Sequence, residues 1–317
     1  MTIADVASLA NAIRQEISKA VIGQSDTIDL MLIAVLSGGH ILLEGPPGTA
    51  KTFLARALSS ALRLDFSRIQ FTPDLMPGDV IGSNIFDFQK SAFQLTKGPV
   101  FTELLLADEI NRTPPKTQAA LLEAMQERAV TIDGVTHDLS PRFTVVATQN
   151  PIEQHGTYPL PEAQLDRFLF KHILDYPNAE EEEKIVARYG VGASAKAPEE
   201  LGVAAADRES INAATRAIED VRLSEEIVAY VVKIIRATRE TTAFSVGASP
   251  RAAAMLAAAG RVKAALDGRD YVIPDDVKAL APPALRHRVI LSPTAEIEGR
   301  DANDALHDIV EQVDAPR

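Results

Sequence analysis

Short, unbroken apolar runs separated by stretches of helical periodicity characterise the first 177 residues. Such runs are typical of strands buried on both faces of a parallel sheet, with the intervening helices covering that sheet. Five runs predict strands, at residues 40–44, 66–72, 104–109, 143–150 and 169–174. Apolar residues at helical spacing predict helices over residues 1–19, about 27–36, 53–58 and 114–126. The pattern therefore predicts an α/β core with a parallel sheet over residues 1–177.

The pattern changes after residue 177, where helical periodicity replaces the strand-like runs. Residues 190–206 are rich in Gly, Ala and Pro, and this composition predicts a linker. Helices are predicted over residues 179–189, 207–219, 224–240, 249–266 and 274–287, with no strand signal between the last four. We expect residues 178–317 to form a small all-α lid domain.

Two segments of the core interrupt the alternation of strands and helices. Residues 73–99 are rich in turns but contain two alternating segments, 84–88 and 92–95, which predict a hairpin; a long surface loop is the alternative. Residues 130–137 alternate around Asp133-Gly134, the dipeptide favoured in two-residue hairpin turns. We expect both hairpins to be insertions in the core.

A phosphate-binding motif follows the first predicted strand. It reads Gly45-Pro46-Pro47-Gly48-Thr49-Ala50-Lys51-Thr52, and an apolar helical stretch comes directly after it. In this context of strand, loop and helix, successive backbone N–H groups and the helix N-terminus hold phosphate oxygens. Lys51 is expected to reach the β- and γ-phosphates, and the Thr52 hydroxyl to ligate Mg²⁺. The motif therefore predicts a nucleoside triphosphate site.

Polar side chains end two other predicted strands. Asp108 and Glu109 close the apolar run that begins at residue 104, and Asn150 closes the run that begins at residue 143. The carboxyl ends of parallel strands meet in one crevice, so these groups should face the bound nucleotide. Asp108 is predicted to hold Mg²⁺ and Glu109 to polarise the attacking water as general base. Asn150 would bind the γ-phosphate or that water, unless it only starts an Asn-Pro turn.

Three further positions have both a functional and an ordinary interpretation. Val21 and Ile22 lie in a small loop shortly before the phosphate loop, where they would hold an adenine ring or merely join two helices. Arg167 follows a short helix, and its ordinary role would be an ion pair with Asp166 or another neighbour. Arg251 lies in the first turn of a predicted helix, where the helix dipole disfavours a cation, so it either serves another purpose or is simply solvated.

Composition narrows the possible environments. There is no Cys, which excludes disulfides and thiolate zinc sites and fits a reducing compartment such as the cytoplasm. No apolar run approaches bilayer length, and residues 1–19 resemble a soluble helix and not a signal peptide. The net charge of −12 is divided evenly, −6 before and −6 after residue 177. Neither part has the basic excess of a nucleic-acid-binding domain.

The order of these motifs resembles that of the AAA+ ATPases, and their detail resembles the MoxR family. The resemblance covers residues 21–176 and continues more loosely beyond them. The segments that carry it are Ala107-Asp108-Glu109-Ile110-Asn111-Arg112, Ala147-Thr148-Gln149-Asn150-Pro151 and Gly156-Thr157-Tyr158-Pro159-Leu160-Pro161-Glu162-Ala163.

The resemblance implies a Mg²⁺-dependent, ATP-hydrolysing ring, usually a hexamer, with each site at a subunit boundary. Arg167 then stands where an arginine finger contacts the neighbouring subunit's γ-phosphate. Arg251 resembles sensor 2, an arginine that contacts nucleotide phosphate. The two hairpins resemble a helix-2 insert and a pre-sensor-1 insertion, which face the ring axis or a partner.

Three uses of such a motor remain open from the sequence. The MoxR resemblance favours chaperone-like remodelling of a protein partner, often one with a von Willebrand factor A domain. The motor subunit of a metal chelatase has a core with the same inserts. A ring that translocates DNA or RNA is disfavoured by the even acidic charge.

Overall fold

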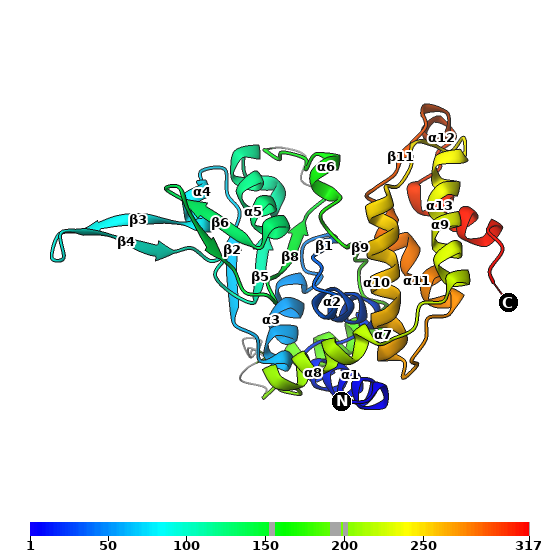
Figure 1. Ribbon diagram of the computed structural model, residues 1–317, viewed down its shortest axis with the longest axis horizontal. Coiled ribbons are helices and arrows are strands. Elements are labelled where there is room, and N and C mark those ends of the chain that lie inside the picture. The colour runs from blue at the N-terminus through cyan, green and yellow to red at the C-terminus, as the bar shows by residue number, and fades with distance from the viewer. Residues whose placement is uncertain (152–155, 191–197, 199–201, 317) are drawn as a thin grey trace.

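A five-stranded parallel sheet forms the centre of the protein (Figure 1). The computed structural model describes residues 1–151, 156–190, 198 and 202–316. The strand order is β2-β5-β8-β1-β9. The strands are β1 (Ile41–Glu44), β2 (Phe66–Gln70), β5 (Leu104–Asp108), β8 (Thr144–Gln149) and β9 (Phe170–Ile173). Each lies within a predicted strand, so the predicted α/β class with a phosphate-loop core is confirmed.

Alternate residues of the strands enter two different hydrophobic clusters, as a sheet covered on both faces requires. In β1, Ile41 and Leu43 belong to one cluster and Leu42 to the other. The first cluster includes residues of α1 (Ile3–Ser18), α2 (Ser25–Leu36) and α3 (Lys51–Leu62), and the second includes residues of α5 (Pro115–Glu127). The sheet is therefore the middle of three layers, and the loops between strands and helices begin at the ends of its strands.

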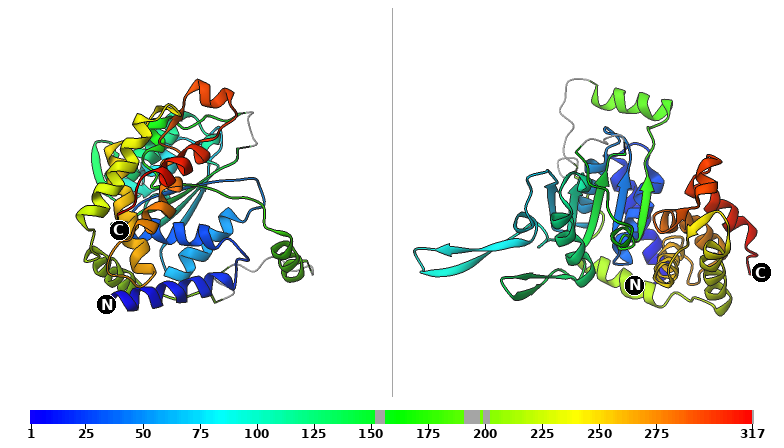
Figure 2. Two further views of the ribbon diagram at one scale, coloured as in Figure 1. Left: turned by 90° about the vertical axis from the view of Figure 1, so that its right-hand side faces the viewer. Right: turned by 90° about the horizontal axis from the view of Figure 1, so that it is seen from above.

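Both predicted hairpins form, and one of them extends far from the body of the protein (Figures 1 and 2). The longer joins β3 (Gly82–Asp87) to β4 (Ala92–Lys97) and follows the short helix α4 (Pro77–Ile81). The shorter joins β6 (Ala129–Ile132) to β7 (Val135–Asp138). Its turn residues, Asp133 and Gly134, both have positive φ, as its two-residue turn requires. The Asn84 amide donates to the Asp133 carboxylate at 2.8 Å and so connects the two hairpins.

The remaining chain is mostly helical. Its helices are α7 (Ala179–Tyr189), α8 (Arg208–Glu219), α9 (Glu225–Glu240), α10 (Pro250–Leu266), α11 (Pro274–Leu285), α12 (Pro293–Ile297) and α13 (Ala302–Gln312). The expectation of a purely α lid was wrong in one detail, because β10 (Phe244–Val246) pairs antiparallel with β11 (Ile290–Leu291). Strands of two and three residues are too short to show a period in the sequence.

The helical part shares its core with the sheet. The cluster that contains Ile41 continues through Leu256 of α10 and Leu285 of α11. The predicted domain boundary at residues 177 and 178 therefore stays a prediction, since the packing is continuous across it. Most of the predicted linker, residues 190–206, lies outside the described residues.

A buried arginine fixes the segment between α6 (Glu162–Leu165) and β9. Arg288 donates to the Asp166 carboxylate at 2.7 Å and to the backbone oxygens of Asp166 and Phe168 at 3.0 and 2.6 Å. Its side chain is 2% exposed, so these partners compensate a fully desolvated cation. Asp166 thus pairs with Arg288, whereas Arg167 donates to the backbone oxygen of Leu122.

Within the described part of the chain, no helix combines the length and the apolar character needed to cross a membrane.

Candidate nucleotide site

A cleft of about 360 Å³ opens at the carboxyl ends of β1, β5 and β8. Parallel strands place their carboxyl ends at one edge of the sheet, which is where open α/β sheets bind ligands. Its lining is Pro47, Gly48, Thr49, Ala50, Lys51, Thr52, Phe53, Arg68, Gln70, Asp108, Glu109, Thr148, Gln149 and Asn150. The structure therefore brings together most of the phosphate loop, both predicted acids and Asn150.

The phosphate loop has the backbone form that an anion cradle needs. Gly48 has a φ of 86°, and a Cβ added there would meet nothing within 4 Å, so its backbone faces open space. Ala50 has a φ of 61°, a strained value for a residue with a side chain, and α3 begins immediately after it. The loop thus directs bare backbone and the positive end of α3 toward the cleft. An anion such as a phosphate group fits this arrangement.

Lys51 lies over its own loop. Its ammonium donates to the backbone oxygens of Gly45 and Pro46 at 2.7 and 2.8 Å. Burial lowers the pKa of this ammonium, and the negative charges of Asp108 and Glu109 oppose the shift. A nearby polyphosphate would act in the same direction as those acids and stabilise the charged form.

Asp108 is the point at which four elements meet. One carboxylate oxygen, Oδ1, accepts the Thr148 hydroxyl from β8 at 2.6 Å. The other, Oδ2, accepts the Thr52 hydroxyl from α3 at 3.2 Å and the Arg68 guanidinium from β2 at 2.7 Å. Each interaction joins β5 to a different neighbouring element, so Asp108 is held in one position.

The Thr52 and Asp108 oxygens fit a magnesium ion. Adjacent ligands of an octahedral Mg²⁺ with bonds near 2.0–2.1 Å lie about 2.9 Å apart. The observed separation of 3.2 Å is close to this value. No group of three or more His, Asp or Glu side chains suited to a metal was found among the described residues. A magnesium ion here would thus take its other ligands from phosphate and water, as it usually does beside nucleotides.

Glu109 is held in an unusual backbone conformation. Its φ of 56° is left-handed, and its N–H donates to the Thr148 hydroxyl at 2.8 Å. The carboxylate accepts from the amide of Gln70 at 2.7 Å and from the Arg112 guanidinium at 3.2 Å. Strain of this kind persists only where the surroundings enforce it, and it is frequent in active sites. Glu109 is therefore the chain neighbour of Asp108, but its carboxylate has different partners from that of Asp108.

Asn150 lies just beyond the carboxyl end of β8, is 8% exposed and lines the cleft. Its position is consistent with a contact to the γ-phosphate or to the attacking water. That role stays a prediction.

Val21, Ile22 and Arg167 are predicted site positions that do not line the cleft. Val21 and Ile22 precede α2, and the Tyr189 hydroxyl of α7 donates to the adjacent backbone oxygen of Ala20 at 2.7 Å. Arg167 lies after α6, directed toward Leu122. Their adenine-binding and catalytic roles stay predictions.

Arg251 lies in the first turn of α10 and is exposed. It makes no hydrogen bond or ion pair with another residue that the structure describes, and it does not line the cleft of its own chain. Its predicted contact with nucleotide also stays a prediction.

Sequence reasoning missed four residues that hydrogen-bond to the carboxylate of Asp108 or Glu109: Arg68, Gln70, Arg112 and Thr148. Arg68 and Gln70 alternate along β2, so both point to the cleft side of the sheet. The pair of long polar residues in an otherwise strand-like run could have indicated that this strand contributes to a site. Thr148 carried a weaker signal, since it lies in β8 two residues before Asn150.

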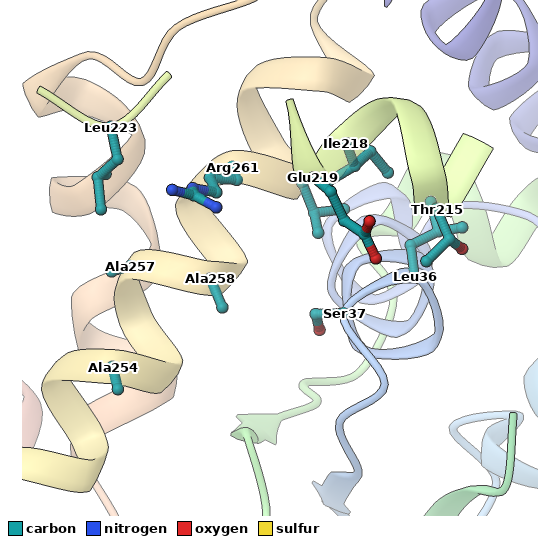
Figure 3. Close-up of a pocket in the computed structure, with 11 residues that line it drawn as sticks. Leu36, Ser37, Thr215, Ile218, Glu219, Leu223, Ala254, Ala257, Ala258 and Arg261 are labelled. Carbon is teal, nitrogen blue, oxygen red and sulfur yellow. The ribbon is translucent and has the colours of Figure 1, made fainter. Parts of the chain in front are cut away.

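A second hollow, of about 380 Å³, lies apart from the cleft between α2, α8 and α10 (Figure 3). Leu36, Ile218, Ala254, Ala257 and other apolar side chains form most of its wall, and Arg261 and Glu219 are its charged members. None of the phosphate-loop residues lines it. It therefore does not compete with the cleft as the nucleotide site.

Comparison with known proteins identifies relatives along almost the whole chain. A model of the ATPase family associated with various cellular activities (AAA) matches residues 40–170, and an AAA lid domain model matches residues 236–309. Chaperone MoxR1 of Mycobacterium tuberculosis is 42% identical, over 99% of this chain and 84% of its own. Protein MoxR of Methylorubrum extorquens is 32% identical, over 95% of this chain and 94% of its own. A crystal structure of a presumed ATPase from Cytophaga hutchinsonii, 40% identical, has a TM-score of 0.89 and covers 99% of this chain and 96% of its own.

The Thr148 hydroxyl yields the first testable prediction. Replacing Thr148 by Val preserves its shape but removes the bonds to Asp108 and to the Glu109 backbone. Loss of a group that orients a metal ligand typically weakens metal affinity by about tenfold or more. We expect Thr148→Val to lower Mg²⁺ affinity by about that factor in calorimetric titrations with a non-hydrolysable ATP analogue. Thr144→Val, on the same buried strand but bonded to the Arg142 backbone, is the control and should bind Mg²⁺ normally.

Proposed function

The chain belongs to the MoxR family of AAA+ ATPases, and from that premise we propose that it hydrolyses ATP to ADP and phosphate with Mg²⁺ as cofactor. One observation carries the proposal. The phosphate loop, the Thr52 and Asp108 oxygens and the Glu109 carboxylate converge on a single cleft. These are the groups that positioning, charge neutralisation and water activation require in phosphoryl transfer to water.

The residues that line the cleft take different parts in the proposed reaction. Backbone N–H groups of the loop and the Lys51 ammonium hold the β- and γ-phosphates. When bound by Thr52 and Asp108, Mg²⁺ supplies further neutralisation of phosphate charge. Glu109 accepts a proton from the attacking water, and Asn150 orients that water in line with the bond that breaks. The fixed backbone of Glu109 supports its role, because a base must be held within hydrogen-bond reach of its proton.

We propose that the site is completed by a neighbouring subunit in a homo-oligomeric ring, a hexamer with closed symmetry. Arg167 would contact the neighbour's γ-phosphate, and Arg251 would contact nucleotide phosphate across the same boundary. The support is geometric: neither arginine lines the cleft of its own chain. The positive charge of Lys51 is partly balanced by the nearby carboxylates of Asp108 and Glu109. Additional cations would therefore be needed to stabilise the charge that develops on the phosphates.

The longer hairpin supports a protein as the client of the motor. Phe88 and Phe93 are 86% and 72% exposed, and both rings stack edge-on against Phe86, at 5.2 and 5.3 Å between ring centroids. Exposed apolar groups gathered in this way mark surfaces that bind other proteins. The two lysines of this hairpin, Lys90 and Lys97, form too small a basic surface for a phosphate backbone. We propose that the protein remodels a partner, such as one with a von Willebrand factor A domain, in the cytoplasm.

Binding and chemistry can be separated by two substitutions. Lys51→Ala removes the cation that faces the γ-phosphate, so ATP affinity should fall sharply. Glu109→Gln preserves shape and Mg²⁺ binding but accepts no proton, so ATP should bind and persist. Equilibrium binding and ATP turnover measured on both variants test this. Turnover at the parental rate in Glu109→Gln would exclude that residue as the base.

Action of Arg167 across a subunit boundary is tested by mixing variants. Arginine fingers contribute about 10³–10⁵ in rate in related nucleotide hydrolases, so Arg167→Ala should bind ATP but barely hydrolyse it. Rings mixed from Arg167→Ala and Glu109→Gln subunits should recover activity, because some sites then combine an intact Glu109 with an intact Arg167. Mixed rings that form, as judged by native mass spectrometry, yet stay inactive would contradict the proposal.

The hairpin phenylalanines test the nature of the client. We expect a cognate von Willebrand factor A protein to stimulate ATP turnover, and Phe88→Ser with Phe93→Ser to abolish that stimulation without changing the basal rate. Gln94→Ser, a polar change on the same hairpin, is the control. Single-stranded DNA, duplex DNA and RNA at low salt should have no effect. Stimulation by nucleic acid that fades as salt rises would instead identify a translocase.

A further inference from the structure

The carboxylate oxygen that would bind magnesium already carries a cation from the protein. Arg68 donates to Oδ2 of Asp108 through Nη2 at 2.7 Å and through Nε at 3.2 Å. The Thr52 hydroxyl reaches the same oxygen at 3.2 Å. Oδ1 accepts the Thr148 hydroxyl, so the oxygen shared by Thr52 and Arg68 is the one that a metal would use.

The position of Arg68 follows from the sheet. β2 is the edge strand beside β5, and Arg68 and Gln70 lie on its cleft side. The Arg68 side chain is 48% exposed, whereas that of Asp108 is 11% exposed. The half-exposed guanidinium therefore reaches a carboxylate that is nearly desolvated, and its other described side-chain partner is the exposed amide oxygen of Gln70, at 2.9 Å. Movement of the guanidinium would thus break no contact with the apolar core.

Two physical requirements act on this pair. A nearly buried carboxylate is costly unless a cation or several hydrogen bonds compensate its charge. A guanidinium and a divalent cation repel one another, and both take the same oxygen. Arg68 and Mg²⁺ would thus compensate the negative charge of Asp108 one at a time and not together.

We propose that Arg68 is a built-in counter-ion that competes with Mg²⁺ for Asp108. When Mg²⁺ binds without nucleotide, the guanidinium that it displaces gains no new anionic partner. Magnesium that arrives with ATP brings phosphate oxygens into the same cleft, where a displaced guanidinium finds a new anionic partner for its planar fork. The pair therefore makes metal binding depend on the nucleotide.

The inference rests on the proposed nucleotide site, and a comparison of charge variants tests it. Arg68→Gln retains polar length but removes the charge, and Arg68→Lys retains the charge. Arg216→Gln, on the exposed side of α8, changes the net charge equally outside the cleft and is the control. Mg²⁺ is titrated calorimetrically into each protein, alone and with a non-hydrolysable ATP analogue, after circular dichroism has established that the variant is folded.

We expect Arg68→Gln to bind Mg²⁺ alone roughly two- to fivefold more tightly than the parent, the range set by a partly exposed ion pair. With the analogue present, the difference should shrink. Arg68→Lys and Arg216→Gln should stay close to the parent. Unchanged or weaker binding of Mg²⁺ alone by Arg68→Gln would overturn the inference.

The two levels of the proposal fail differently. If the parent protein shows no Mg²⁺-dependent binding of the analogue, the proposed nucleotide site itself is wrong. If the parent binds the analogue with Mg²⁺ and Arg68→Gln behaves identically with Mg²⁺ alone, only the counter-ion role is wrong.

Discussion

The compensation of one nearly buried charge, that of Asp108, organises the centre of this protein. Its two oxygens are satisfied from three directions, by Thr148 of β8, by Thr52 of α3 and by Arg68 of β2. Thr148 also accepts the Glu109 N–H and so fixes the strained backbone beside it. Because a desolvated carboxylate must be compensated by hydrogen bonds or a cation, Asp108 connects α3, β8 and the edge strand β2 around Glu109.

The edge strand β2 connects this centre to the most exposed part of the molecule. Gln70, its last residue, donates to the Glu109 carboxylate, and the chain then continues through α4 into the β3–β4 hairpin. The hairpin extends away from the body and carries the exposed phenylalanines (Figure 2). The carboxyl end of a single strand thus bonds both carboxylates and leads directly toward the candidate client surface. Contacts made by the hairpin and contacts made by the nucleotide therefore act on the same short element.

The sequence predicted the elements well and the contacts between them poorly, for a physical reason. The strand ending in Asp108 and Glu109 is recognisable because burial on both faces demands an unbroken apolar run, and the Asp133-Gly134 turn because few residues tolerate its positive φ. Arg68 gave no comparable signal, since its role depends on β2 lying next to β5, and strand order is not written in local periodicity. For the same reason local sequence offers Asp166 as an ordinary ion-pair partner of Arg167, whereas Asp166 pairs with Arg288, far along the chain.

The distribution of arginines also bears on the proposal that a neighbouring subunit completes the site. Within its own cleft, the chain places Lys51 over the phosphate loop and Arg68 on Asp108. Arg288 is bonded to Asp166 and the backbone around it, and Arg167 donates to the backbone oxygen of Leu122 and does not line the cleft. Arg251 remains exposed at the start of α10, where the helix dipole gives it no stabilisation. Few cations of the same chain are thus placed to stabilise charge on a transferring phosphoryl group, and this scarcity supports the proposal that Arg167 and Arg251 of a neighbouring subunit complete the site.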